Sequence, residues 1–296
     1  MGYRELFTSY PLIFSGVQKT LEEAEYVILG VPFDVTSTFR SGARFAPFAI
    51  REASLNIETY SFRAGFDFEE LKLHDLGDLN IVGEADETIR RVELVSKELL
   101  NENKLPVLIG GEHTITLGAL QSMGDGITIV SFDAHLDLRN EYLGRTLSHA
   151  TFMRRIWENT HPHKILEVGT RAVCREELEY AKEFDIPFLT TQQIYRYGIE
   201  NTIEKIVQQL SDQDRIYLSI DMDVLDPAFA PAVQNPEPDG LSIRTLLDIL
   251  SGICDERILG FDVVEVTPHY DRGSTAIQAA KIIFEILCYL ETSKKN

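Results

Sequence analysis

The stretch Ser131-Phe132-Asp133-Ala134-His135-Leu136-Asp137 alternates three side chains that can bind metal with residues that cannot. It follows an apolar run, Ile127-Thr128-Ile129-Val130, which is typical of a short buried strand. Alternate residues at the end of a strand point to the same side of the sheet. We therefore expect Asp133, His135 and Asp137 to converge on one point at the carboxyl end of this strand.

Two further clusters of metal-competent residues also follow strand-like runs. Ser219-Ile220-Asp221-Met222-Asp223 comes after Arg215-Ile216-Tyr217-Leu218, and Gly110-Gly111-Glu112-His113 comes after Val107-Leu108-Ile109. A single aspartate of this kind is often only a turn or cap residue. Three clusters that together offer imidazoles and carboxylates favour a metal centre instead. The ligand set suits a pair of divalent ions such as Mn²⁺ better than one tetrahedral Zn²⁺.

The remaining sequence alternates apolar strand-like runs with amphipathic helical patterns. The expected strands cover residues 26–31, 71–76, 105–109, 127–132, 164–169, 186–189, 215–220 and 257–264. The expected helices cover 48–57, 84–103, a segment from 114, 148–158 with Ser148 as N-cap, 175–184, 201–210, 242–252 and a segment from 274. This alternation predicts an α/β fold, with a mainly parallel sheet between two layers of helices. We see no linker or repeat, so we expect a single domain over residues 1–296.

Composition and charge narrow the classes of function. The chain has 28 basic and 47 acidic residues, a net charge of −19, which disfavours nucleic acid and suits a small cationic substrate. Its three cysteines lie far apart and predict no disulfide framework, which fits the cytoplasm. The apolar segment 276–290 contains Lys281 and Glu285 and is too short to cross a bilayer, so we expect no membrane association.

The clustered motifs resemble those of the ureohydrolases, the arginase and agmatinase family, and are most similar to its agmatinase members. The motifs are Gly-Gly-Glu-His-Thr (110–114), Ser-Phe-Asp-Ala-His-Leu-Asp (131–137) and Ser-Ile-Asp-Met-Asp-Val-Leu-Asp-Pro-Ala-Phe-Ala-Pro (219–231). Val-Pro-Phe-Asp (31–34), Arg-Ser-Gly-Ala-Arg-Phe (40–45) and Leu-Ser-His-Ala-Thr (147–151) are similar as well. The resemblance extends over residues 30 to 270 and implies an arginase-like αβα sandwich.

The resemblance also implies a site with two Mn²⁺ ions per chain. One ion would be held by His113, Asp133, Asp137 and Asp221, and the other by Asp133, His135, Asp221 and Asp223. Glu265 matches the glutamate that binds the substrate guanidinium, and His149 matches a histidine that shuttles a proton to the leaving amine. Asp137 would in addition steer the attacking hydroxide. Relatives of this kind form trimers or hexamers, so the resemblance implies a homo-oligomer.

Two departures from the family pattern leave the substrate open. Glu112 stands where aspartate is commoner, which we expect to be harmless because the ligand is His113. The loop 232–240 reads Ala-Val-Gln-Asn-Pro-Glu-Pro-Asp-Gly in place of Gly-Thr-Gly-Thr-Pro-Glu-Pro-Gly-Gly. Agmatine is the leading substrate, and aminopropyl-agmatine, a guanidino acid and formiminoglutamate are alternatives. A catalytically inert, metal-stabilised binding protein is the alternative of a different class, although such a chain would be expected to lose ligands that are all present here.

Overall fold

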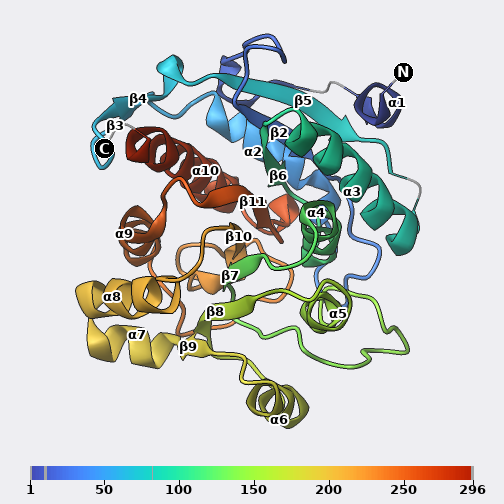
Figure 1. The fold of residues 1–296 in the computed structure, drawn as a ribbon, viewed down its shortest axis with the longest axis vertical. Coiled ribbons are helices and arrows are strands. Elements are labelled where there is room, and N and C mark those ends of the chain that lie inside the picture. The colour runs from blue at the N-terminus through green and yellow to red at the C-terminus, as the bar shows by residue number, and fades with distance from the viewer. Residues whose placement is uncertain (1, 10–11, 82, 295–296) are drawn as a thin grey trace.

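A nine-stranded sheet forms the centre of the chain, for which we use a computed structural model that describes residues 2–9, 12–81 and 83–294 (Figure 1). The strand order is β1-β5-β2-β6-β11-β10-β7-β8-β9. Neighbouring strands are parallel except β1 and β5, which are antiparallel. The strands are β1 (Thr8–Ser9), β2 (Tyr26–Gly30), β5 (Leu73–Leu79), β6 (Leu105–Ile109), β7 (Thr128–Phe132), β8 (Lys164–Thr170), β9 (Phe188–Thr190), β10 (Ile216–Asp221) and β11 (Ile258–Val264).

Helices cover both faces of this sheet (Figure 1). They are α1 (Tyr3–Phe7), α2 (Ala46–Ser54), α3 (Ala85–Asn101), α4 (Thr116–Met123), α5 (Phe152–Asn159), α6 (Arg175–Glu183), α7 (Thr191–Tyr197), α8 (Ile199–Gln209), α9 (Ile243–Ile253) and α10 (Ser274–Ser293). No helix of the described segments is long and apolar enough to cross a membrane.

The two faces of the sheet belong to two separate hydrophobic clusters. Ile28 of β2 packs in the cluster that contains residues of α2, α7, α8, α9 and α10. Its neighbours Val27 and Leu29 pack in the cluster formed with α3, α4, α5 and α6. Every residue of β2 is buried, as expected for a parallel strand covered on both faces. The predicted three-layer αβα sandwich with a mainly parallel sheet is therefore confirmed.

Several element boundaries differ from those predicted. Ser148 is not a helix N-cap, because α5 begins only at Phe152, with Thr151 as N-cap. Ser148 instead closes a turn, in which its carbonyl oxygen accepts from the backbone N–H of Thr151. The sequence analysis also missed α7 and the short hairpin of β3 (Tyr60–Ser61) and β4 (Phe66–Asp67). Residues 1, 10, 11, 82, 295 and 296 of the expected domain lie outside the described part.

Candidate metal centre

The carboxyl ends of four adjacent strands, β6, β11, β10 and β7, form the edge on which the predicted site residues lie. The strand register keeps these ends level, since Ile109 pairs with Val263 and Ile220 pairs with Phe132. His113 follows β6, Glu265 follows β11, Asp221 is the last residue of β10, and Asp133 follows β7. Side chains separated by up to 152 residues in sequence therefore meet at one place.

Two short turns, rather than the pleat of a strand, direct the ligands. Because β7 ends at Phe132, the predicted alternation does not extend through Asp137, which has a positive φ of 52°. Asp133 Oδ1 instead accepts a hydrogen bond from the backbone N–H of His135 at 2.6 Å. Asp221 Oδ1 accepts from the backbone N–H of Asp223 at 2.8 Å in the same way. The two turns bring the residue pairs onto a common centre.

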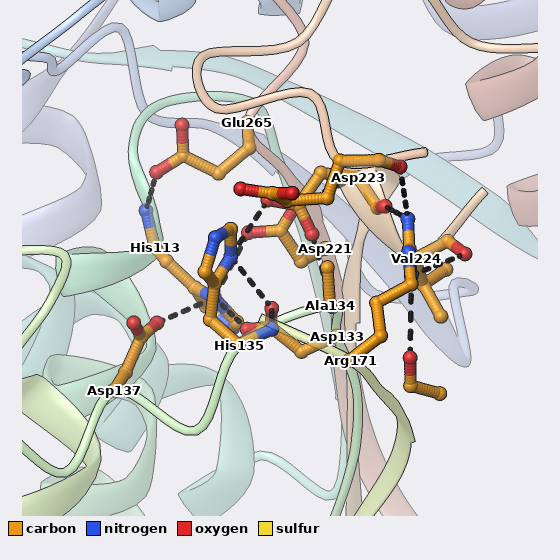
Figure 2. A network of polar contacts seen from close by, with 12 residues as sticks. His113, Asp133, Ala134, His135, Asp137, Arg171, Asp221, Asp223, Val224 and Glu265 are labelled. Carbon is orange, nitrogen blue, oxygen red and sulfur yellow. Dashed lines mark hydrogen bonds and ion pairs between the residues drawn. The ribbon is translucent and has the colours of Figure 1, made fainter. Parts of the chain in front are cut away.

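The candidate ligands form two groups that share Asp133 (Figure 2). In the first group, His113 Nδ1 lies 3.0 Å from Asp133 Oδ2 and 3.1 Å from Asp221 Oδ2. In the second group, His135 Nδ1 lies 3.0 Å from Asp223 Oδ2 and 3.4 Å from Asp133 Oδ1. Asp137 borders the first group, with its Oδ2 at 3.6 Å from His113 Nδ1. All six predicted ligands are thus brought together.

The hydrogen bonds of His113 leave its Nδ1 atom facing the carboxylates. Ser219 Oγ donates to Asp262 Oδ1 at 2.6 Å, so Ser219 must accept from His113 Nε2, which lies 2.8 Å away. Nδ1 is buried and has no hydrogen bond of good geometry to any group in the described ranges. Burial lowers the pKa of His113, but the close carboxylates of Asp133 and Asp221 outweigh it and raise the pKa well above its usual value. A proton at this nitrogen therefore stands where a metal ion would bind.

The other carboxyl groups of the centre lack enough cationic partners. Burial and the charges of Asp223 and Asp133 raise the pKa of Asp221. Burial and the charge of Asp133 raise the pKa of Asp137 in the same way. Crowded, buried carboxylates are stable as ions only when cations offset them. The imidazole and carboxylate donors present fit two divalent ions of hard-to-borderline character.

Glu265 lies beside the centre with one carboxylate oxygen held and the other available. Its Oε1 accepts from the backbone N–H of His113 at 2.7 Å, whereas Oε2 is buried without a hydrogen bond to the described residues (Figure 2). The Glu265 backbone has a φ of 67° and donates to the carbonyl of Gly111 at 2.9 Å. Gly111 itself has a φ of 82°, and a Cβ atom there would lie 2.4 Å from the Val31 carbonyl oxygen, so this position requires glycine.

A pocket of about 470 Å³ opens onto the centre. Its lining includes His135, Asp223, Glu265 and His149, together with Asn235 from the loop 232–240. The loop that departs from the family pattern therefore forms part of the pocket wall. Burial and the charge of His135 lower the pKa of His149 to about 4, so this imidazole is neutral near pH 7.

Arg171 is a pocket residue that the sequence analysis missed (Figure 2). Its side chain donates to six backbone carbonyl groups, which belong to Gly169, Asp223, Val224, Leu225, Glu237 and Pro238. The shortest of these bonds, at 2.6 Å, reaches the carbonyl oxygen of Asp223. Its backbone N–H also bonds to Ala134 at 2.8 Å. Arg171 thus joins both ligand turns to the 232–240 loop, and no motif in the sequence marks that role.

Comparison with known proteins identifies the family of this chain. The model of the arginase family matches residues 24–289, and the chain belongs to that family. It is 36% identical to the N(1)-aminopropylagmatine ureohydrolase of Thermococcus kodakarensis, over 95% of this chain and 94% of that protein. It is 34% identical to an agmatinase of Bacillus anthracis, over 93% of this chain and 95% of that protein.

Solved structures give the same result at the level of the fold. The crystal structure of the agmatine ureohydrolase of Thermoplasma volcanium superposes with a TM-score of 0.90 at 36% identity, and the match covers 99% of this chain and 98% of that one. Formimidoylglutamase from Bacillus subtilis has a TM-score of 0.84 at 27% identity, with coverage of 97% and 91%. The arginase-like fold predicted from the motifs is confirmed.

Proposed function

We propose that this chain hydrolyses the guanidino group of a small cationic substrate to urea and an amine, with agmatine, which yields putrescine, as the leading substrate. The observation that carries the proposal is the meeting of six metal-competent side chains beside a buried carboxylate with a free oxygen, Glu265 Oε2. Arginase-family membership and the agmatinase relatives support the same reaction.

Two Mn²⁺ ions are the cofactors we propose for the centre. His113, Asp133, Asp137 and Asp221 would hold one ion, while His135 and Asp223 would hold the other with Asp133 and Asp221 shared. The contact distances around Asp133 support its sharing, because each of its oxygens faces a different histidine. When bound, such ions lower the pKa of a water molecule enough to supply hydroxide near neutral pH.

The chain's own residues would then orient the substrate and move the protons. Glu265 binds the planar guanidinium through its free Oε2 and fixes the carbon for attack, since carboxylate and guanidinium pair with directional charged hydrogen bonds. Asp137 accepts a hydrogen bond from the attacking water. His149 is neutral at rest because its pKa is lowered, so it must take a proton before it gives one to the leaving amine. The C–N bond then breaks to release the amine. The hydroxyl proton left on the carbon fragment leaves as urea forms, and the amine takes it up, so the positive charge of the guanidinium ends on the ammonium product.

The choice of a cationic substrate rests on charge and on relatives. The net charge of −19 favours the approach of cations over that of guanidino acids. The relatives named as agmatinase and as aminopropylagmatine ureohydrolase have closely similar identities to this chain, so aminopropyl-agmatine is the second candidate. Loop 232–240 lies at the pocket wall and would set the length of the substrate that fits.

The deciding experiment is urea release by the Mn²⁺-loaded protein from agmatine, aminopropyl-agmatine, arginine and guanidinobutyrate, compared side by side. Metal content per chain is measured on the same sample. We expect a strong preference for one of the two dications. Absence of urea from every substrate at two bound ions per chain would refute the proposed reaction, and activity confined to guanidinobutyrate would refute the cationic substrate.

We further propose a single ureohydrolase domain over residues 1–296, a cytoplasmic location and a homo-oligomeric state, as a trimer or hexamer. The exposed aromatic side chains Phe39, Phe45 and Tyr270 support assembly. Arg40 stacks on both Phe39 and Tyr270, and Phe45 packs edge-on against His269. Subunit interfaces commonly bury apolar patches of this kind. Light scattering coupled to size-exclusion chromatography tests the assembly, and a monomer at micromolar concentration would contradict it.

A further inference from the structure

His149 is held between two threonine hydroxyl groups, one on each ring nitrogen. Its Nδ1 lies 3.3 Å from Thr36 Oγ1, and its Nε2 lies 3.2 Å from Thr38 Oγ1. Thr36 is buried, whereas Thr38 is exposed and lines the pocket. The two nitrogens therefore have different surroundings, and only Nε2 is on the pocket side.

Glu112 anchors the buried side of this arrangement. Its Oε2 accepts from the backbone N–H of Thr36 at 2.7 Å, and its Oε1 accepts from the Thr36 hydroxyl at 2.5 Å. The Thr114 hydroxyl donates to the same Oε1 at 2.6 Å. All three donors therefore point at the two carboxylate oxygens of Glu112, so that the carboxylate acts only as an acceptor in this cluster.

Counting the protons decides which tautomer of His149 these bonds allow. The Thr36 hydroxyl has one proton, and Glu112 receives it, so the oxygen of Thr36 can only accept from other groups. It accepts from the backbone N–H of His149 at 3.0 Å, and its remaining lone pair faces Nδ1. Nδ1 must therefore be protonated. In the neutral ring, Nε2 is then the bare nitrogen, and the hydroxyl of Thr38 can donate to it.

We infer that Glu112 and Thr36 are positioning residues that fix the Nδ1–H tautomer of His149, so that Nε2 exchanges the proton during turnover. The inference rests on the proposed role of His149. Nε2 takes a proton from the attacking water, which breaks an O–H bond and forms an imidazolium. That N–H bond breaks again as the proton passes to the leaving nitrogen of the substrate. Glu112, which we expected to be harmless in the sequence analysis, is thus assigned a role, because its carboxylate holds the hydroxyl and the backbone N–H of Thr36.

The tautomer can be measured without any turnover. We would record ¹⁵N spectra of histidine-labelled protein near pH 7.5, both metal-free and loaded with diamagnetic Mg²⁺, and assign His149 by its loss in His149→Asn. The expected result is a protonated Nδ1 and a bare Nε2 in both samples. A bare Nδ1 with a protonated Nε2 would overturn the inference, because the Thr36 hydroxyl would then have to donate to Nδ1 instead of to Glu112 Oε1.

Matched variants connect the tautomer to catalysis. Thr36→Val removes the hydroxyl at nearly constant volume, and Thr36→Ser restores it. We expect Thr36→Val to mix the two tautomers and lower kcat by roughly 10- to 100-fold, within the range of acid–base catalysis. KM and metal content should stay unchanged, and Thr36→Ser should recover most of kcat. Thr160→Val, which removes another buried hydroxyl that bonds to Ile156, controls for the loss of a buried threonine hydroxyl as such.

The outcomes separate this inference from the proposed function. Wild-type kcat together with a wild-type ¹⁵N spectrum in Thr36→Val would overturn the positioning role. Full urea release by His149→Asn would overturn the shuttle role, and with it the use of Nε2. An inactive His149→Asn variant combined with a protonated Nε2 in the wild type would overturn the tautomer assignment alone.

Discussion

Replacing Arg171 by lysine tests whether the carbonyl cluster around its side chain holds the site together. The guanidinium group has five N–H donors and makes six hydrogen bonds to backbone carbonyl oxygens. At least one N–H is therefore shared between two carbonyl oxygens. A lysine ammonium has three donors and a flexible stem, so at best it retains three of the six contacts. Arg171→Lys keeps the positive charge and changes mainly the geometry.

The expected loss follows from the number of broken contacts. Three lost hydrogen bonds at about 1 kcal/mol each lower the free energy of unfolding by about 3 kcal/mol. With an unfolding entropy of about 2.1 cal/mol/K per residue over 296 residues, the melting temperature falls by about 5 °C. The loop 235–238 should also move away from the pocket. We expect KM to rise about tenfold, which corresponds to about 1.4 kcal/mol of binding.

Thermal unfolding of the metal-loaded protein and steady-state urea release measure these two effects. Arg244→Lys is the matched control, because the Arg244 side chain is 85% exposed and its ion pair with Asp248 is 3.8 Å long. That exchange should change the stability by less than about 0.5 kcal/mol. If Arg171→Lys unfolds within 1 °C of the wild type and keeps its KM, the carbonyl contacts do not hold the loop and the reasoning is wrong.

Three further predictions concern the centre itself. Asp133→Asn should lose bound metal and nearly all activity, as elemental analysis and urea release would show; two tightly bound ions with normal turnover would remove Asp133 from the ligand set. Glu265→Gln should keep both ions but lower kcat/KM roughly 100-fold, which is about 2.7 kcal/mol, and a loss of metal would mean that Glu265 is a ligand instead. Neighbouring aspartates raise the pKa of His113 and His135 despite the burial of both imidazoles, so the metal-free protein holds protons there. Metal binding must displace these protons. The metal affinity should therefore rise with pH, and calorimetry should detect proton release on binding. An affinity independent of pH between 6 and 8 would contradict that assignment.

The sheet could be predicted from sequence because its central strands are continuous apolar runs. Residues 105–109, for example, were expected as a strand and form β6 with the same boundaries. Strand ends in a parallel sheet share one edge, so the meeting of His113, Asp133 and Asp221 also followed from the pattern. In this part of the site, short-range sequence signals and the overall fold agree.

The parts that could not be predicted depend on contacts distant in sequence or on backbone turns. Arg171 acts through carbonyl groups as far away as Pro238, and backbone acceptors have no sequence signature. The alternation of side chains along a strand predicted that Asp137 would lie near Asp133 and His135, and it does lie there. The reason is different, because the strand ends at Phe132 and Asp137 lies in a turn with positive φ. The tautomer of His149 depends on Glu112, whose substitution looked neutral in the sequence.

The candidate metal centre lowers the stability of the fold, which indicates that its residues serve chemistry rather than folding. Asp137 and Glu265 both adopt positive φ angles, a conformation that costs non-glycine residues about 1 to 3 kcal/mol each. Burial and the charges of Asp221 and Glu112 also raise the pKa of Glu265, which means that its ionised form is destabilised. Glycine at position 265 would relieve both costs and keep the backbone bond to Gly111, but it would remove Oε1, the acceptor for the backbone N–H of His113. A metal-stabilised scaffold would gain nothing from the free carboxylate oxygen Oε2, whereas a ureohydrolase needs that oxygen to bind the substrate guanidinium.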